Sequence, residues 1–297
     1  MTEAVTLIVG ADSMIGQGLW SLLHCAGVRV AGTTRRPRPK EVPLVHLDLA
    51  KDLRNWRCPW PVAVAVICAG ATRIDACQQD PEATALINVQ GVITLIKCLV
   101  EEGVFVIYLS SNQVFDGSLP QRRPDEATCP ITEYGRQKAE VERRLQDFGD
   151  QVAVMRLTKV LGPRPSLLTD WAQTLKEGRP IKAFADMGLA PIPLFCVVSA
   201  LRLVADQRLP GILQISSQQD ISYAEAAYYG AQVLGADRRL VQPVMASKSA
   251  NYPYPVPTYS SLNSDRLRLA LGITAPDVRQ TLELAFTNPG LLAGGED

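Results

Sequence analysis

Residues 5–18 read VTLIVGADSMIGQG, and this stretch decides the fold that the sequence predicts. Its first five residues are mostly β-branched or leucine, which is typical of a short buried strand. Gly10 ends the run, at a turn where glycine gives the backbone extra freedom. Residues 19–26 then show helical spacing. The stretch therefore predicts a strand, a tight turn and a helix in direct succession.

A turn that leads into a helix N-terminus favours a ligand with phosphate groups. The first N–H groups of a helix lack backbone partners and lie at the positive end of its dipole. Gly16 would let the helix pack closely against the strand. A glycine pattern alone is a weak signal, and an ordinary strand–turn–helix is the alternative. Its place after the first strand favours a dinucleotide-binding loop.

Apolar runs and helical patterns alternate from residue 5 to residue 157. Further strands are predicted at 28–32, 44–49, 62–69, 104–109 and 152–157, and helices at 86–100 and 133–148. Because these strands are apolar throughout, they predict an α/β fold with a doubly wound parallel sheet covered on both faces. Prolines interrupt the pattern after Gly162. We therefore predict a cofactor domain at 1–162 and a smaller, mainly substrate-binding domain at 163–297, with a return of part of 181–220 to the sheet as an open alternative.

The composition argues against several classes of protein. The 297 residues carry 30 basic and 30 acidic side chains, whereas a dedicated nucleic-acid binder usually has a basic excess. The longest apolar stretch, at 62–71, is shorter than the roughly 20 residues that span a bilayer, and the N-terminus lacks a basic signal-peptide region. Seven cysteines without C-x-x-C spacing indicate buried free thiols, and two isolated histidines predict no metal site. The expectation is a soluble cytoplasmic protein with no nucleic-acid or membrane partner.

The end of the second predicted strand bears on the choice of cofactor. An NAD site usually has an acidic residue there that holds the ribose 2′-hydroxyl. This chain has Arg35 and Arg36 instead, which suit a 2′-phosphate. A solvated basic loop that also includes Arg38 and Lys40 is the alternative. The position favours NADP(H) over NAD(H), which stays possible.

Tyr134 and Lys138 form a Tyr-x-x-x-Lys pair on one face of a predicted helix. Tyrosine is a poor acid–base catalyst at neutral pH, and a neighbouring ammonium group, together with the cationic nicotinamide of an oxidised cofactor, is expected to lower its pKa. Ser111 follows the predicted strand 104–109, at the edge of the sheet where such folds bind ligands. Its hydroxyl group would bind a substrate carbonyl. The three side chains predict a catalytic set.

These residues, in this order, resemble the extended branch of the short-chain dehydrogenase/reductase superfamily, and more narrowly its dTDP-4-dehydrorhamnose reductase-like, sugar-nucleotide-binding group. The resemblance covers nearly the whole chain. It is carried by residues 10–16, 46–49, 68–70, 77–81, 88–91, 111–117, 134–138, 156–163 and 262–267. Ser13 stands where the branch has its middle glycine.

The resemblance implies a Rossmann domain, a smaller C-terminal substrate domain, and NADPH-dependent reduction of a keto group on a nucleotide-linked sugar. Tyr134 would donate the proton, with Ser111 and Lys138 as the other catalytic residues. The residues that it assigns to cofactor binding are Gly10, Ser13, Met14, Ile15, Gly16, Arg35, Arg36, Asp48, Leu49, Cys68, Ala69, Gly70, Tyr134 and Lys138.

Departures from the group's pattern narrow this expectation. Asn112 and Gln113 replace the Asp-Glu pair of the dehydratases, and amides cannot exchange protons at neutral pH, so dehydration is disfavoured. Lys159, Phe195 and Val256 stand where rhamnose reductases have other residues, so the substrate stays open. Two alternatives remain: a non-catalytic NADP-binding regulatory subunit, and an NAD-dependent sugar-nucleotide epimerase. A homodimer through the helices at 86–100 and 133–148 is a further expectation.

Overall fold

The computed structural model describes residues 4–36, 43–163, 166–249 and 252–294. Arg38 and Lys40 of the predicted basic loop lie outside these ranges. A seven-stranded sheet has the order β11-β6-β5-β4-β1-β2-β3. Its strands, in chain order, are β1 (Val5–Val9), β2 (Val30–Thr34), β3 (Leu44–His46), β4 (Val62–Ile67), β5 (Phe105–Ser111), β6 (Val152–Leu157) and β11 (Gly211–Ile215). The pairings from β3 to β5 are parallel. The fold is therefore the predicted Rossmann-type α/β fold.

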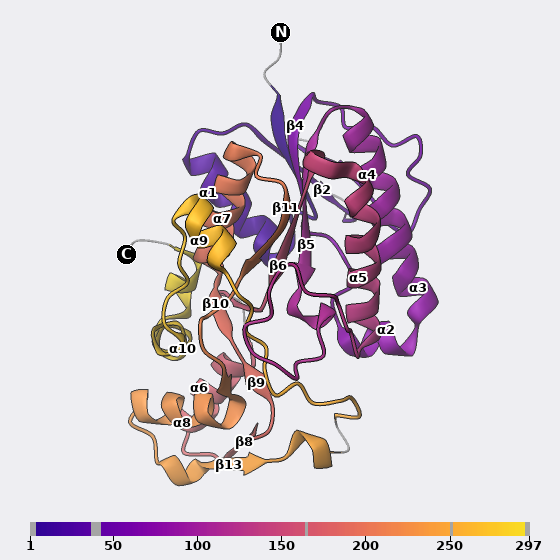
Figure 1. Cartoon of the computed structure of the whole chain (residues 1–297). Helices are drawn as coiled ribbons and strands as arrows, with labels where there is room; N and C mark the ends of the chain where they lie inside the picture. Colours follow the sequence, from indigo (N-terminus) through magenta and orange to yellow (C-terminus); the bar gives the residue numbers. More distant parts are fainter. Residues whose placement is uncertain (1–3, 37–42, 164–165, 250–251, 295–297) are drawn as a thin grey trace. The chain divides into compact units, whose positions relative to one another are not determined.

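Helices cover both faces of this sheet (Figure 1). α1 (Met14–Cys25) and α7 (Leu194–Gln207) lie on one side, and α4 (Val92–Glu101) and α5 (Glu133–Leu145) lie on the other. Two short helices, α2 (Ile74–Gln79) and α3 (Pro81–Ala85), precede α4 and have no counterpart in the predicted pattern. A π-helical turn, η1 (Leu86–Gly91), joins α3 to α4. Short 3₁₀ turns, η2 (Asn112–Val114) and η3 (Gln146–Gln151), follow β5 and α5.

The sheet is buried because its strands carry apolar residues on both faces. Leu7, Ile8 and Val9 of β1 are all fully buried, and β5 and β6 are buried along their whole length. One face packs on α4 and α5 through Leu95 and Val141, among others. Continuous helix from residue 81 to residue 101 is long and apolar enough to cross a membrane, but half of its most apolar part is buried inside the structure. Six of its apolar residues, Val89, Val92, Leu95, Ile96, Leu99 and Val100, belong to the core of the sheet.

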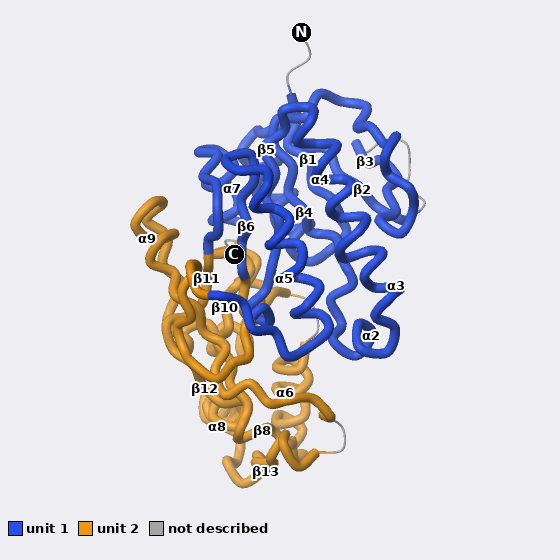
Figure 2. The backbone as a smooth tube through the Cα atoms, turned by 45° about the vertical axis from the view of Figure 1, so that its right-hand side comes forward, with its two compact units in different colours: residues 1–114, 127–156, 198–213 blue, residues 115–126, 157–197, 214–297 orange. Residues whose placement is uncertain are grey.

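Contacts divide the chain into two compact units (Figure 2). Unit 1 comprises residues 1–114, 127–156 and 198–213, and unit 2 comprises residues 115–126, 157–197 and 214–297. The sequence predicted one boundary, at residue 162. The division is more complex because the chain leaves unit 1 after β5, returns for α5 and β6, and returns again for α7 and β11. β11 lies within the 181–220 segment for which a return to the sheet was the alternative.

Unit 2 has its own apolar core and three two-stranded sheets. The core includes Trp171, Leu282 and Phe286, which are all buried. The strands of this unit are β7 (Lys159–Leu161), β8 (Ile181–Phe184), β9 (Gly188–Leu189), β10 (Pro191–Pro193), β12 (Ile221–Ser222) and β13 (Val241–Val244). Its helices are α6 (Leu167–Lys176), α8 (Tyr223–Val233), α9 (Asp265–Leu271) and α10 (Val278–Thr287), with short turns η4 (Arg238–Leu240), η5 (Ala246–Lys248) and η6 (Pro289–Ala293).

Candidate active site

The turn between β1 and α1 has the geometry that the glycine pattern predicts. Gly10 has a φ of +83°, and a Cβ atom there would lie 2.8 Å from the Cβ atom of Ala69. A larger residue is therefore excluded both by backbone conformation and by space. Ser13 caps α1, since its hydroxyl group accepts a hydrogen bond from the Gly16 N–H at 3.0 Å. A Cβ atom on Gly16 would overlap the Gly10 carbonyl oxygen.

This turn forms one wall of a pocket of about 520 Å³ in unit 1. Nine of the predicted cofactor-binding residues line it: Gly10, Ser13, Arg35, Arg36, Asp48, Leu49, Cys68, Ala69 and Gly70. Met14, Ile15, Gly16, Tyr134 and Lys138 are not among the lining residues. The lining also includes residues that the sequence analysis missed: Asp12, Thr33, Thr34, Leu47, Ala71 and Ile87. Asp12, Leu47 and Ala71 follow the ends of β1, β3 and β4, so the topology was the signal for them, whereas Thr33 and Thr34 lie inside β2 and Ile87 lies in η1.

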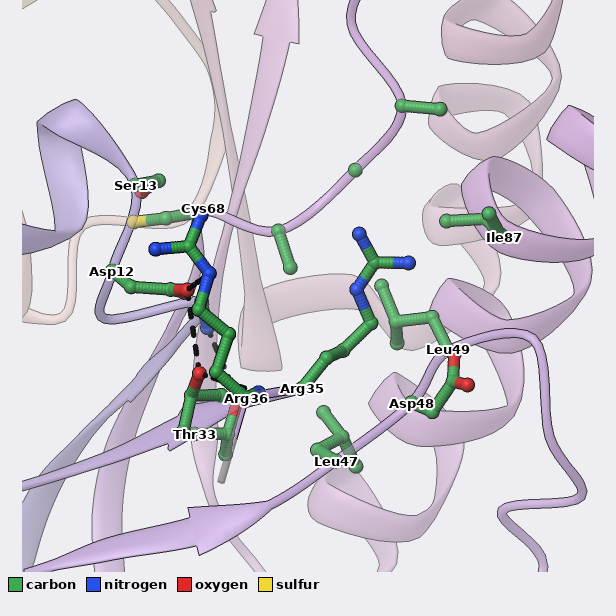
Figure 3. Close-up of a pocket in the computed structure, with 15 residues that line it drawn as sticks. Asp12, Ser13, Thr33, Arg35, Arg36, Leu47, Asp48, Leu49, Cys68 and Ile87 are labelled. Carbon is green, nitrogen blue, oxygen red and sulfur yellow. Dashed lines mark hydrogen bonds and ion pairs between the residues drawn. The ribbon is translucent and has the colours of Figure 1, made fainter. Parts of the chain in front are cut away.

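Two arginines reach into this pocket from the end of β2 (Figure 3). The Nε atom of Arg36 lies 3.5 Å from a carboxylate oxygen of Asp12, and the Thr34 hydroxyl group donates to the same oxygen at 3.3 Å. Figure 3 shows Arg35 extended toward Leu49 instead. A helix N-terminus and two cations in one pocket suit a ligand that carries several phosphate groups.

Residues 88–91 (Asn-Val-Gln-Gly), which carry part of the family resemblance, contact two loops that line the pocket. The Asn88 side chain accepts a hydrogen bond from the Ala71 N–H and donates one to its carbonyl oxygen, both at 2.8 Å. Asn88 also donates to Gln137 of α5 at 2.8 Å. A Cβ atom on Gly91 would overlap the Leu49 carbonyl oxygen. This element therefore fixes the loops after β3 and β4 where they line the pocket.

Ser111 and Tyr134 meet at the carboxyl end of β5. Thr132 caps α5 by accepting the Gly135 N–H at 3.1 Å, and a Cβ atom on Gly135 would overlap the Gln113 carbonyl oxygen. This close approach brings α5 onto the segment that follows Ser111. Burial is the main cause that raises the pKa of Tyr134, the neighbouring Cys77 adds to it, and a side-chain hydrogen bond with Ser111 opposes it. The lowering expected from Lys138 together with an oxidised nicotinamide stays a prediction; in this structure burial is the largest effect on the pKa of Tyr134.

The side chain of Lys138 is buried beneath this pair. Its ammonium group donates to the Leu109 carbonyl oxygen at 2.8 Å and lies 4.6 Å from the centre of the Tyr108 ring. It lies 5.7 Å from the centre of the Tyr134 ring. Burial lowers the pKa of Lys138 to about 8, against the opposing effect of Glu142. Its charge also acts on Cys68, which lines the pocket and whose pKa burial raises to about 12. The ammonium group of Lys138 thus lies near the Tyr134 ring and acts electrostatically on Cys68 of the pocket.

Three further polar residues lie behind this site, and the sequence analysis did not identify them. Arg156 of β6 and Glu142 of α5 form an ion pair at 2.7 Å with side chains that are 1% and 4% exposed. Ser110 donates to the same carboxylate at 2.5 Å. An arginine inside the apolar strand 152–157 was the available signal, because a buried charge requires a partner.

The residues that depart from the group's pattern have varied surroundings. Lys159 of β7 is exposed, as expected for a surface residue, whereas Phe195 and Val256 are half-buried. Asn112 and Gln113 are half-buried directly after β5.

Among the described residues, no group of three or more His, Cys, Asp or Glu side chains is arranged to hold a metal ion. All seven cysteines are free: Cys77 and Cys196 are buried, Cys25 is exposed, and the other four are half-buried.

Comparisons with known proteins show what this chain is similar to. The family model of the RmlD substrate binding domain matches residues 4–289. The probable low-salt glycan biosynthesis reductase Agl14 of Haloferax volcanii is 25% identical over 95% of this chain and 98% of its own length. The dTDP-4-dehydrorhamnose reductase of Burkholderia thailandensis is 26% identical over 94% and 96%. Methionine adenosyltransferase 2 subunit beta of Xenopus tropicalis is 32% identical over 52% of this chain and 47% of its own length.

Solved structures share the fold at lower identity. The dTDP-4-dehydrorhamnose reductase of Bacillus anthracis str. Ames, in complex with NADP, has a TM-score of 0.79 at 19% identity, covering 96% of this chain and 98% of that one. MoeE5, in complex with UDP-glucose and NAD, has a TM-score of 0.80 at 23% identity, covering 97% and 100%. Since the family model spans nearly the whole chain, the protein belongs to the RmlD substrate binding domain family, within the extended short-chain dehydrogenases/reductases.

Proposed function

We propose that this protein is an NADPH-dependent reductase of a keto group on a nucleotide-linked sugar. The observation that carries the proposal is the joint placement of Ser111, Tyr134 and Lys138 at the carboxyl end of β5. They lie in the same unit as the pocket at the turn between β1 and α1. Relatives over nearly the full length are a dTDP-4-dehydrorhamnose reductase and a probable glycan biosynthesis reductase. MoeE5, which has the same fold, binds UDP-glucose.

The pocket residues fit a nicotinamide dinucleotide. The turn at Gly10 and the N-terminus of α1 would hold its pyrophosphate, and Asp48 and Leu49 would lie at its adenine. Arg35 and Arg36 would pair with a 2′-phosphate, which supports NADP(H) over NAD(H). The Bacillus anthracis relative in structure is in complex with NADP. When bound, the reduced cofactor supplies the hydride.

The protein's own residues supply the proton and its alignment. Burial keeps Tyr134 in its protonated form, which is the form that a reduction consumes. The alkoxide formed on the substrate is a far stronger base than a phenolate, so it takes the proton from the tyrosine hydroxyl group. Ser111 orients the carbonyl by a hydrogen bond. The ammonium group of Lys138 then stabilises the phenolate that remains on Tyr134.

Enzyme assays test this proposal directly. Purified protein is expected to oxidise NADPH with at least one member of a panel of nucleotide-linked 4-keto sugars, assayed beside free keto acids and simple ketones. Formation of water-eliminated products is not expected, because Asn112 and Gln113 are amides. Turnover of the simple ketones alone would contradict the nucleotide-sugar part of the proposal, and turnover of no carbonyl compound would contradict the reductase part.

Replacing both Arg35 and Arg36 with serine is expected to weaken NADPH binding by about 10- to 100-fold, because two charge-assisted contacts are lost. Binding of NADH should change less than about 3-fold, since it has no 2′-phosphate. Isothermal titration calorimetry measures both. The matched control replaces Arg238 and Arg239, an exposed adjacent pair on η4 that does not line the pocket. Equal losses for both cofactors would contradict an NADP preference.

The second candidate function is a non-catalytic, NADP-binding regulatory subunit. It is favoured by the match to methionine adenosyltransferase 2 subunit beta, although that match covers only about half of either chain. NADPH binding without oxidation of any carbonyl in the panel, together with co-purification of an enzyme partner, would support it. An epimerase of the same fold would instead retain tightly bound NAD after purification.

We propose a cytoplasmic location and a small-molecule partner, with no nucleic acid. The homodimer stays a prediction. The outward side of α5 carries Arg136, Arg143 and Arg144, which pair with glutamates of the same helix. Any interface there would have to include these charges, and sedimentation analysis at two ionic strengths would measure whether salt changes the oligomeric state.

A further inference from the structure

The most unusual buried feature of unit 1 is the cluster of Ser110, Glu142 and Arg156 behind the candidate site. Arg156 has its Nε atom 3.1 Å from both carboxylate oxygens of Glu142, in addition to the 2.7 Å contact of Nη2. Its side chain is among the largest fully buried ones in the described residues. A buried ion pair is weak evidence for stability, because desolvation offsets much of its attraction. The cluster therefore calls for a functional explanation.

The cluster is joined to the candidate catalytic set through two elements. Glu142 follows Lys138 by four residues on α5, so the two side chains lie on the same face of the helix. Leu109, Ser110 and Ser111 are consecutive at the end of β5. Lys138 binds the Leu109 carbonyl oxygen and Glu142 binds the Ser110 hydroxyl group. Two consecutive turns of α5 thus hold the strand end that carries Ser111, with Tyr134 one turn earlier on the same helix.

The charges around Lys138 also indicate Glu142 as the residue that acts on it. The groups that act on its ammonium group, or whose rings face it, are Glu142, Cys68, Cys77, Tyr108 and Tyr134. Burial raises the pKa of Cys68, Cys77, Tyr108 and Tyr134, so these four groups are uncharged near neutral pH. Glu142 is the one carboxylate among these five groups. Its charge is also the largest of the effects that favour the charged form of Lys138.

We propose that Glu142 is a positioning residue that keeps Lys138 charged and in place, and that Arg156 and Ser110 hold its carboxylate in the required orientation. The inference rests on the proposed reductase function only for its effect on turnover. The carboxylate binds Arg156 and Ser110, while the ammonium group of Lys138 binds the Leu109 carbonyl oxygen. The cluster would therefore act on catalysis without touching the substrate.

The test is the titration of Lys138 itself, measured by NMR in protein with ¹³C-labelled lysine side chains. The chain has eight lysines, and a Lys138→Arg variant identifies the signal. In the unchanged protein Lys138 should titrate near pH 8. In Glu142→Gln the titration is expected to move to lower pH by on the order of one unit, because an adjacent negative charge is lost in a poorly solvated site.

The same shift should appear in the pH dependence of kcat/KM on an active ketone. Glu142 opposes the lowering of the Lys138 pKa by burial, and this keeps the lysine charged at alkaline pH. Loss of Glu142 should therefore move the alkaline limb of the pH profile to lower pH by the same amount. Glu140→Gln removes a carboxylate that pairs with Arg143 and Arg144 on the same helix and does not act on Lys138, so it should leave the Lys138 titration within about 0.3 units. A purely structural role of Glu142 would lower the activity of Glu142→Gln without moving its Lys138 titration.

A second variant covers the case in which Glu142→Gln does not fold. Glu142→Gln with Arg156→Gln removes both buried charges and keeps amide hydrogen bonds, and it is expected to shift the Lys138 titration in the same direction by a smaller amount. An unchanged Lys138 titration in either variant that folds would overturn the inference. A shifted titration in a protein that reduces no carbonyl compound would support the inference and refute the proposed reductase function, so the two failures are distinguishable.

Discussion

Replacing Tyr134 with phenylalanine is expected to lower turnover at least 100-fold, while the Kd for NADPH stays within about 2-fold. The substitution keeps the ring in its half-buried place and removes only the hydroxyl group that would protonate the substrate. Tyr134 is not among the residues that line the pocket at the turn between β1 and α1, so the affinity for NADPH should stay nearly unchanged. Steady-state kinetics and a fluorescence titration with NADPH measure the two quantities.

The matched control is Tyr228→Phe on α8, which makes the same chemical change at a tyrosine in unit 2 that the proposed mechanism does not use. Its turnover should equal that of the unchanged protein. If the Tyr134 variant kept more than a tenth of the turnover, the tyrosine would not be the proton donor. Loss of NADPH binding in that variant would instead indicate that the hydroxyl group helps to hold the cofactor.

Replacing Arg156 with methionine is expected to reduce the free energy of unfolding of unit 1 by about 3–5 kcal/mol, because the buried carboxylate of Glu142 loses its ion-pair partner. The pair is almost fully buried, at 1% and 4% exposure, so solvent cannot replace the missing charge. Urea unfolding, followed by a probe placed in unit 1, measures the change.

A double variant provides the control for this stability effect. Arg156→Met combined with Glu142→Leu removes both charges and fills the space with apolar groups, so most of the lost stability should return. An exposed pair, Arg239 with Asp237 on η4, serves as a comparison, since breaking it should cost less than about 1 kcal/mol. If the two substitutions at the buried pair were additive instead, the loss would come from packing and not from an unpaired charge.

Local patterns predicted a large part of unit 1. The sequence placed β1 at 5–9 and β6 at 152–157, and the structure has the same bounds. Buried parallel strands produce uninterrupted apolar runs, which are easily recognised. The helices at 74–79 and 81–85 were missed because each is shorter than two turns and gives no periodic signal. The domain boundary was placed at 162 because pattern alone does not show that a strand such as β11 returns to the sheet.

The sequence by itself determined the Rossmann-type fold and the family, because the patterns that carry them lie in short stretches of the chain. Gly10, Ser13 and Gly16 lie within seven residues, and Tyr134 and Lys138 lie on one turn of helix. Only the tertiary structure decided the pKa values and the charge pairing of the site. It desolvated the hydroxyl group of Tyr134 so that its pKa is raised, and it paired Arg156 with Glu142 across fourteen residues behind Lys138. The physical reason is that desolvation and charge pairing depend on what surrounds a group in space, which neighbours in the chain do not specify.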